Sequence, residues 1–166
     1  MTDWAEIYRS TYPELFRFLH RKVWDEERAK DLAQECFVRA LAHDPEKPRQ
    51  WLFRVAGNLA RDDARLVIRR RRHLALLRVE TMEDADPGPD VEADRREKTA
   101  RLREALEELT DRDRDVLLLW DSGQSYSEIA EQTGLSEGAI GTTLSRAKRR
   151  LVESYDALER KDAALG

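Results

Sequence analysis

The sequence predicts an all-α protein made of two small helical domains joined by a flexible acidic linker. Apolar residues recur along most of its 166 residues at intervals of three and four, which is the period of an amphipathic helix. Glycine is rare outside turns, and runs of β-branched residues, which favour strands, are absent. The helical pattern is interrupted once, by an acidic stretch. We therefore expect domains at 1–78 and 95–166, with the linker at 79–94.

The linker is predicted from charge and proline. Residues 80–94 contain seven acidic side chains and no basic one, and they include Pro87-Gly88-Pro89. Proline has no amide hydrogen to donate and restricts the residue before it, so a helix through this stretch is not expected. High charge with few apolar residues is typical of a flexible segment.

The first domain is predicted to hold three helices. The first covers 3–22, with Pro13 as a point where it can kink, and Asp25 is a suitable N-cap for a second helix over 25–42. Residues 43–50 are expected to form a loop, and a long third helix runs from Trp51 to about residue 72. The apolar positions that define the first helix are Trp4, Ile7, Tyr8, Leu15, Phe16 and Leu19.

The second domain is predicted to hold four helices. The first two cover 94–109 and 111–120, and Ser122-Gly123 forms a turn. A short helix over 125–132 ends at Gly134, and Ser136 caps a last helix that extends to Leu158.

Composition excludes several classes of protein. The chain has no run of about 20 apolar residues, as a membrane span needs, and its first residues lack the features of a signal peptide. The single cysteine, Cys36, excludes a disulfide framework and is expected to be a buried apolar residue. The three histidines share no metal-ligand spacing. We therefore expect a cytoplasmic protein without membrane insertion, metal or cofactor.

The net charge of −4 hides a strongly uneven distribution. Residues 54–78 contain eight arginines against Asp62 and Asp63, and four of the five residues 146–150 are basic. Partners respond to the local field and not to the total charge, so binding to nucleic acid is not excluded.

Residues 125–151 show a helix-turn-helix pattern. One face of the first helix carries Tyr126, Ile129, Ala130 and Thr133, and the core stripe of the next carries Ile140, Leu144, Ala147 and Leu151. The opposite face of this second helix presents small hydroxyls and arginines: Thr142, Ser145, Arg146 and Arg149. Such a face suits a helix lying in the major groove of DNA. The alternative is a helical hairpin whose basic face is only solvated.

The third predicted helix also has two distinct sides. Leu52, Val55, Ala56, Leu59 and Leu66 form a core sector, and a polar stripe holds Trp51, Arg54, Asn58, Arg61, Asp62, Arg65 and Arg69. Arginines contact phosphates, asparagine can read a base edge, and tryptophan can stack on an unstacked base. The alternatives are that Trp51 packs against the previous helix and that residues 69–72 form a solvated helix end. A metal site at Asp62-Asp63 is not expected, because neighbouring residues on a helix diverge by about 100°.

The second predicted helix carries a small polar patch. Its core positions are Leu32, Cys36, Phe37 and Ala40, whereas Asp31, Gln34 and Glu35 share another side. This patch indicates either a protein partner or a solvated face.

Together these segments resemble one family, the sigma-70-type RNA polymerase sigma factors of the extracytoplasmic-function (ECF) group. Residues 31–40 resemble the family's polymerase-clamp helix, and 51–58 with Asp62, Arg65 and Arg69-Arg70 are similar to its −10 promoter helix. Residues 106–119 resemble the first helices of sigma domain 4, and 126–151 resemble its reader of the −35 element. The resemblance covers roughly residues 4 to 156, with the linker in the matching place.

The resemblance implies a transcription initiation factor that binds RNA polymerase core, opens the −10 element and recognises the −35 element. Domain 2 (1–78) would grip the clamp of the largest subunit through Asp31, Gln34 and Glu35. The stripe on the third helix would melt the −10 element, with a flipped base held by the loop 43–50 and the start of that helix. Domain 4 (95–166) would sit on the flap of the other large subunit. Its −35 contacts would come from Ser136, Thr142, Ser145, Arg146, Lys148 and Arg149.

The same resemblance implies no catalysis and an anti-sigma factor as a further partner. One alternative is a stand-alone helix-turn-helix transcriptional regulator, which the C-terminal half alone would fit. An enzyme such as a nuclease would need clustered carboxylates or a nucleophile–base pair, and neither is apparent.

Two positions depart from the family pattern. Many relatives carry lysine or arginine at the position of Gly141, and arginine at the position of Thr143. An arginine at position 143 is therefore expected to add a phosphate contact, and Gly141 costs about 1 kcal/mol of helix propensity relative to alanine.

Overall fold

A computed structural model describes residues 1–76 and 90–166, and these residues form seven α-helices in two compact units, Met1–Glu83 and Asp84–Gly166. The all-α prediction is confirmed. The helices are α1 (Trp4–Val23), α2 (Glu26–His43), α3 (Pro48–Leu76), α4 (Asp90–Glu107), α5 (Asp111–Asp121), α6 (Tyr126–Thr133) and α7 (Glu137–Leu165).

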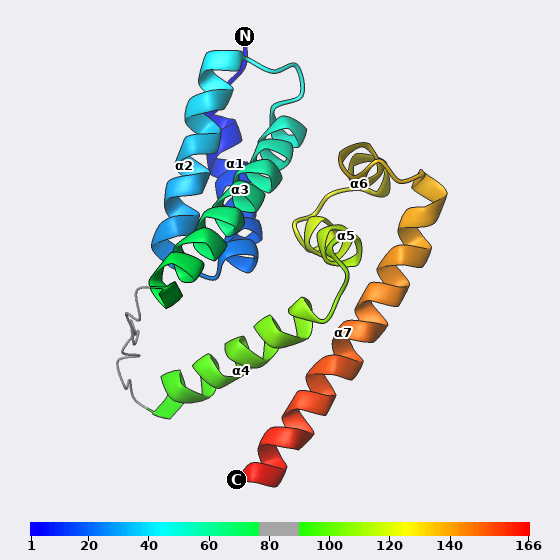
Figure 1. Ribbon diagram of the computed structural model, residues 1–166. Coiled ribbons are helices and arrows are strands. Elements are labelled where there is room, and N and C mark those ends of the chain that lie inside the picture. The colour runs from blue at the N-terminus through cyan, green and yellow to red at the C-terminus, as the bar shows by residue number, and fades with distance from the viewer. Residues whose placement is uncertain (77–89) are drawn as a thin grey trace. The chain divides into compact units, whose positions relative to one another are not determined.

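The first unit is a bundle in which α1, α2 and α3 each pack against the other two (Figure 1). Side-chain caps fix where the first two helices begin. Asp3 accepts a hydrogen bond from the Glu6 amide at 3.1 Å, and Asp25 accepts one from the Arg28 amide at 2.9 Å. The predicted cap at Asp25 is therefore confirmed, and Pro13 lies inside α1.

Large apolar side chains from all three helices form the core of this unit. Leu15 and Leu19 of α1, Cys36 of α2, and Leu52 and Phe53 of α3 are all buried. Cys36 is thus the buried apolar residue that the sequence predicted. Its burial raises the pKa of the thiol to about 12, because a thiolate would lose its hydration there.

We expect the Cys36 thiol to be unreactive in the folded protein at pH 8. An exposed cysteine, with a pKa of about 8.5, reacts readily under these conditions. Ellman's reagent should therefore release its chromophore slowly in buffer and rapidly in urea. Equal rates in the two conditions would show that Cys36 is accessible in the native state.

Two details of the predicted first unit are wrong. Residues 43–50 were expected to be a loop, but α2 includes His43 and α3 begins at Pro48, so only 44–47 lie between them. Proline suits the first turn of a helix, where its missing amide hydrogen has no partner to lose. The buried side of α3 also differs from the predicted core sector. Leu66 was expected in the core but is 45% exposed, whereas Phe53, Ala60 and Asp63 are buried.

In the second unit α7 packs along α4, α5 and α6 (Figure 1). The core brings together Leu106, Val116, Ile129, Ile140 and Leu144. The chain at the end of α4 is held from the next helix, because the Arg114 guanidinium donates to the carbonyl oxygens of Leu106 in α4 and of Leu109 just beyond it, at 2.9 and 3.2 Å.

Two helices of this unit are longer than predicted. Residues 77–89 of the expected linker lie outside the described residues, but 90–94 belong to α4, so this part of the linker prediction is wrong. Acidic side chains suit the positive N-terminal end of a helix, and Asp94 pairs with Lys98 at 3.1 Å.

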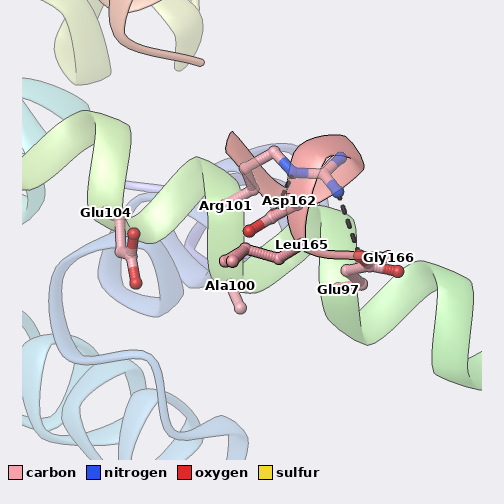
Figure 2. A pocket seen from close by; sticks show the side chains of 7 residues that line it. All are labelled: Glu97, Ala100, Arg101, Glu104, Asp162, Leu165 and Gly166. Carbon is pink, nitrogen blue, oxygen red and sulfur yellow. Dashed lines mark hydrogen bonds and ion pairs between the residues drawn. The ribbon is translucent and has the colours of Figure 1, made fainter. Parts of the chain in front are cut away.

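The helix α7 continues past Leu158 to Leu165 because its end packs on α4. Arg101 of α4 donates to Asp162 of α7 at 3.0 Å and to Glu97 at 3.1 Å, beside a shallow pocket where the end of α7 meets the middle of α4 (Figure 2). No helix in the described ranges is both long and apolar enough to span a bilayer.

Candidate nucleic-acid interface

The polar stripe of α3 lies on the surface of the first unit. Six of its members are exposed: Arg54, Asn58, Arg61, Asp62, Arg65 and Arg69. The one ion pair recorded within this stripe joins Arg65 and Asp62 at 3.9 Å, and both side chains are about two-thirds exposed. Such a surface pair contributes little net energy, so Arg65 can exchange Asp62 for a phosphate at small cost.

The seventh member of the stripe, Trp51, is half-buried. Its ring stacks on that of His43, the last residue of α2, with centroids 5.4 Å apart and an interplanar angle of 21°. Packing against the previous helix was one of the two sequence interpretations. The contact holds the start of α3 against the end of α2.

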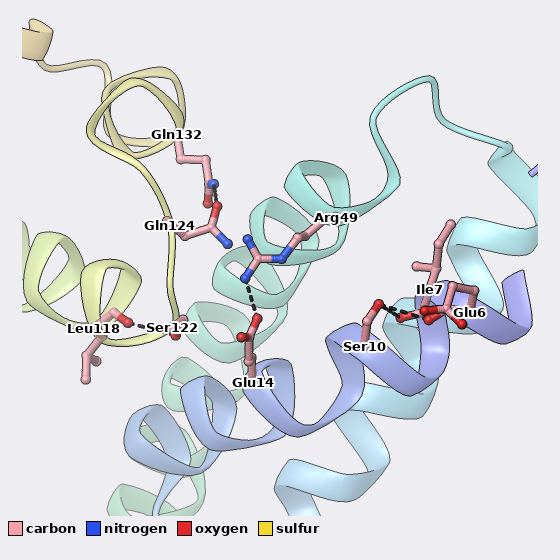
Figure 3. A network of polar contacts seen from close by, with 9 residues as sticks. All are labelled: Glu6, Ile7, Ser10, Glu14, Arg49, Leu118, Ser122, Gln124 and Gln132. Carbon is pink, nitrogen blue, oxygen red and sulfur yellow. Dashed lines mark hydrogen bonds and ion pairs between the residues drawn. The ribbon is translucent and has the colours of Figure 1, made fainter. Parts of the chain in front are cut away.

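Ion pairs hold α3 against both of its neighbours. Arg49, in the first turn of α3, pairs with Glu14 of α1 (Figure 3), and the buried Asp63 accepts a hydrogen bond from Arg28 of α2. The sequence indicated no partner for Asp63, and a metal site there was not expected. Its actual partner lies 35 residues away, which no local pattern indicates. The part of α3 between these two ion pairs, which carries Arg54, Asn58 and Arg61, is thus held against both neighbouring helices.

The polar patch on α2 is exposed as predicted. Asp31, Gln34 and Glu35 are all accessible, and Glu35 accepts a hydrogen bond from Arg39 at 2.7 Å. The same side of α2 also exposes two large apolar residues, Val38 (62%) and Leu41 (57%). These two residues were not predicted as part of the patch, although they follow Gln34 by four and seven residues and so share its side. Apolar side chains among polar ones are typical of a protein-binding surface.

The helix-turn-helix of the second unit is formed by α6 and α7. Ser125 caps α6 by accepting from the Glu128 amide at 3.1 Å, and Gly134 ends it with a φ of 75° while its amide donates to Ala130 at 3.0 Å. Glycine adopts this left-handed conformation without a steric penalty. Ser136 occupies the N-cap position of α7, but its side chain makes no cap hydrogen bond, so that part of the prediction is wrong.

The start of α7 differs from the prediction at Thr143. Ile140, Leu144 and Ala147 are buried as expected, and Thr142, Ser145, Arg146 and Arg149 are exposed. Thr143, however, is only 6% exposed. It follows Ile140 by three residues and precedes Ala147 by four, so it faces the core, and the expected phosphate contact from position 143 is wrong. Tyr126 of α6 was expected to be buried but is 44% exposed.

Two basic side chains of α7 interact with α5. The Arg146 guanidinium makes two hydrogen bonds to Asp113, from Nε to Oδ2 at 3.1 Å and from Nη2 to Oδ1 at 2.8 Å. These bonds lower the pKa of Asp113, and they join residues 33 positions apart, so the sequence could not indicate them. Lys148 places Nζ 3.5 Å from the centre of the Trp120 ring. Both cations therefore help to hold α7 on α5.

Gly141 lies where α7 meets α6. A Cβ atom built at this position would stand 3.6 Å from Cε2 of Tyr126, which is an ordinary van der Waals distance. We therefore expect Gly141→Ala to raise the free energy of unfolding of the second unit by about 1 kcal/mol, through helix propensity. Urea unfolding followed by circular dichroism measures this change.

Gly134→Ala provides the control for that prediction. The φ of 75° at Gly134 is unfavourable for alanine, so the same type of substitution should destabilise the unit. A loss of stability in Gly141→Ala would show that the added methyl group clashes with the ring of Tyr126.

A unit with an arginine stripe and a unit with a helix-turn-helix define a DNA-binding transcription factor. Comparison with family models matches residues 7–73 to Sigma-70 region 2 and residues 99–151 to Sigma-70, region 4. The polar stripe of α3 lies within the first match, and the helix-turn-helix lies within the second.

Similar curated proteins point to the same family. The RNA polymerase sigma factor YlaC of Bacillus subtilis is 33% identical over 156 residues, which cover 88% of each chain. The ECF RNA polymerase sigma factor SigM of the same organism is 30% identical, with 91% of this chain and 94% of SigM covered. The fold resembles that of sigma factor RpoE, solved in complex with the anti-sigma factor NepR from Bartonella quintana. The TM-score is 0.66 at 23% identity, covering 94% of this chain and 98% of RpoE.

The chain therefore belongs to the sigma-70 family of RNA polymerase sigma factors, in the ECF group. It is a transcription initiation factor that binds RNA polymerase core and directs it to specific promoters. The match to region 2 disfavours the alternative of a stand-alone helix-turn-helix regulator, because that alternative accounts for the C-terminal half alone.

Proposed function

We propose that the two units divide promoter recognition between them. Residues 1–78 act as domain 2, which binds the polymerase clamp and opens the −10 element. Residues 90–166 act as domain 4, which binds the flap and reads the −35 element, and 79–89 connect the two. The observation that carries the proposal is the stripe of six exposed side chains on α3, four of them arginines, within the region 2 match.

On the −10 element, the arginines of the α3 stripe bind phosphates and Asn58 reads a base edge. Extruding a base costs a few kcal/mol of stacking, which a shaped pocket can offset. We place this pocket between residues 44–47 and the first turns of α3, beside Trp51. The ring of Trp51, half-buried against His43, offers a rigid apolar wall there.

On the −35 element, the exposed side of α7 lies in the major groove. Ser136, Thr142, Ser145 and Arg149 are all exposed and supply hydroxyl and guanidinium donors. Arg146 is half-exposed, so it can contact DNA while it remains bonded to Asp113. Lys148 adds positive charge at the edge of this surface.

The proposed polymerase contact is the exposed side of α2. Asp31, Gln34 and Glu35 supply polar contacts to the clamp, and Val38 and Leu41 add apolar area beside them. Interfaces of this kind combine a desolvated apolar centre with a polar rim.

Three further assignments follow from the family. We propose that the chain has no catalytic activity of its own, and that it acts in the cytoplasm, where its polymerase is. RpoE from Bartonella quintana was solved with an anti-sigma factor, and we propose a partner of the same class for this chain.

Run-off transcription tests the proposal. Purified core polymerase with the full-length chain should produce discrete transcripts from a library of genomic fragments, and core polymerase alone should not. The same discrete products from core alone, or none with the chain added, would contradict the proposed function.

We expect Asn58→Ala to impair opening of the −10 element more than formation of the closed complex. Asn58 is exposed, and alanine is the better helix former, so the bundle should not be weakened. Permanganate reactivity of thymines measures opening, and a mobility shift measures the closed complex.

The control for that variant is Arg9→Ala, an exposed residue of α1 outside the stripe, which should open promoters normally. Wild-type thymine reactivity in Asn58→Ala would remove Asn58 from the −10 contacts.

A further inference from the structure

Asp113 is a buried acidic residue for which the assignments above leave no role in DNA recognition. It lies in the first turn of α5 and is only 4% exposed. We propose that Asp113 is a positioning residue for promoter reading. Its carboxylate holds the Arg146 guanidinium by its Nε and Nη2 edge, so that the end of the guanidinium, with Nη1 and Nη2, is presented to the −35 element. The inference rests on the proposed function, in which α7 reads this element.

The hydrogen bonds define which edge remains available. An arginine has five N–H donors, and Asp113 takes the one on Nε and one of the two on Nη2, at 3.1 and 2.8 Å. The three others, two on Nη1 and one on Nη2, have no recorded acceptor in the described part of the chain. A pair of donors on Nη1 and Nη2 matches O6 and N7 of guanine, which is the commonest specific contact between proteins and DNA.

The position of Asp113 makes it a rigid support. Thr110 caps α5 and accepts from the Asp113 amide at 3.2 Å, so the carboxylate projects from a well-formed helix end. A buried carboxylate without a partner would be costly, which keeps the pair closed. An unrestrained arginine must give up rotamer freedom when it binds. Arg146 has already given it up in the free protein, and this preorganisation favours one orientation over others.

Arg149 provides an internal comparison on the same helix. It is exposed, and no ion pair with another described residue is recorded for it. We therefore expect Arg149 to bind phosphate without fixed orientation and Arg146 to select a base. Truncation of Arg149 should weaken binding to all sequences alike and lower the salt slope by about one.

The test uses the full-length chain assembled with core polymerase. A promoter recovered by run-off transcription supplies the DNA, with its −35 element randomised, and sequencing of bound and free pools reports relative affinities. Asp113→Asn should relax the preference at one base pair by about 5- to 150-fold. Arg146→Ala and Arg146→Lys should relax it at the same base pair, and the double variant Asp113→Asn/Arg146→Ala no further than Arg146→Ala. Ser125→Ala, which removes the cap of α6, should lower stability without changing the preference.

The outcomes separate the role of Asp113 from the proposed function. If Asp113→Asn kept the wild-type base preference and only lowered the thermal midpoint, the inference would be overturned. The Asp113–Arg146 pair would then serve stability alone. Tighter binding to every sequence would also overturn it, because the carboxylate would then be withholding Arg146 from DNA. If Asp113→Asn does not fold, Asp113→Glu replaces it, because glutamate keeps the negative charge on a side chain longer by one methylene group. An unaltered base preference in Asp113→Glu would count against a positioning role for Asp113. A wild-type complex that selects no −35 sequence would refute the proposed function itself.

Discussion

Thr143→Arg is expected to destabilise the second unit by about 3 kcal/mol and not to strengthen DNA binding. Thr143 is 6% exposed and belongs to the buried side of α7, together with Ile140, Leu144 and Ala147. An arginine there must either place its charge in an apolar core without a partner or push α7 away from its neighbours. Urea unfolding of the full-length chain, followed by circular dichroism, measures the loss.

Thr142→Arg is the matched control, because it introduces the same side chain one residue earlier at an exposed position. It should leave stability nearly unchanged, and on the proposed DNA-facing side it should steepen the salt dependence of −35 binding by about one. If Thr143→Arg were as stable as Thr142→Arg, the observed register of α7 would be incorrect.

Replacing Asp31, Gln34 and Glu35 together by alanine should reduce association with core polymerase by tenfold or more, which corresponds to about 1.4 kcal/mol. All three side chains are exposed on α2 and lie outside the core of the bundle, so the fold should remain intact. The substitution frees Arg39 from Glu35, and this exposed pair contributes little to stability. Recovery of core subunits on the immobilised chain measures association.

The control must match the loss of two negative charges. Glu6→Ala/Glu153→Ala removes two exposed acidic side chains from α1 and α7, away from the α2 patch, and should bind core polymerase normally. Unchanged recovery with the triple variant would argue against α2 as the clamp contact. Equal losses in both variants would indicate that net charge, and not the patch, determines association.

Local signals predicted most of the secondary structure. Asp25 and Gly134 mark helix ends because capping depends on the residues next to it in the chain. The exposed stripe on α3 was also predictable, since helical periodicity alone places Arg54, Asn58 and Arg61 on one side. The linker prediction failed at 90–94, where Glu92 and Asp94 pair with Arg96 and Lys98 one turn later and where acidic side chains suit the start of a helix.

The sequence by itself determined the helical class, the patch on α2 and the basic faces of α3 and α7, because periodicity and charge pattern are properties of each segment alone. Tertiary structure decided which side of each helix meets a neighbour. Only packing buries Thr143 and leaves Leu66 exposed. The residues that could face the core cover more of a helix surface than its neighbours contact, so the sequence does not determine which residues at the margin are buried. The pairs Asp63–Arg28 and Asp113–Arg146 join residues 35 and 33 positions apart. Such pairs form only when separate helices pack together. A buried carboxylate needs a cationic partner, and the fold decides which cation lies close enough to supply it.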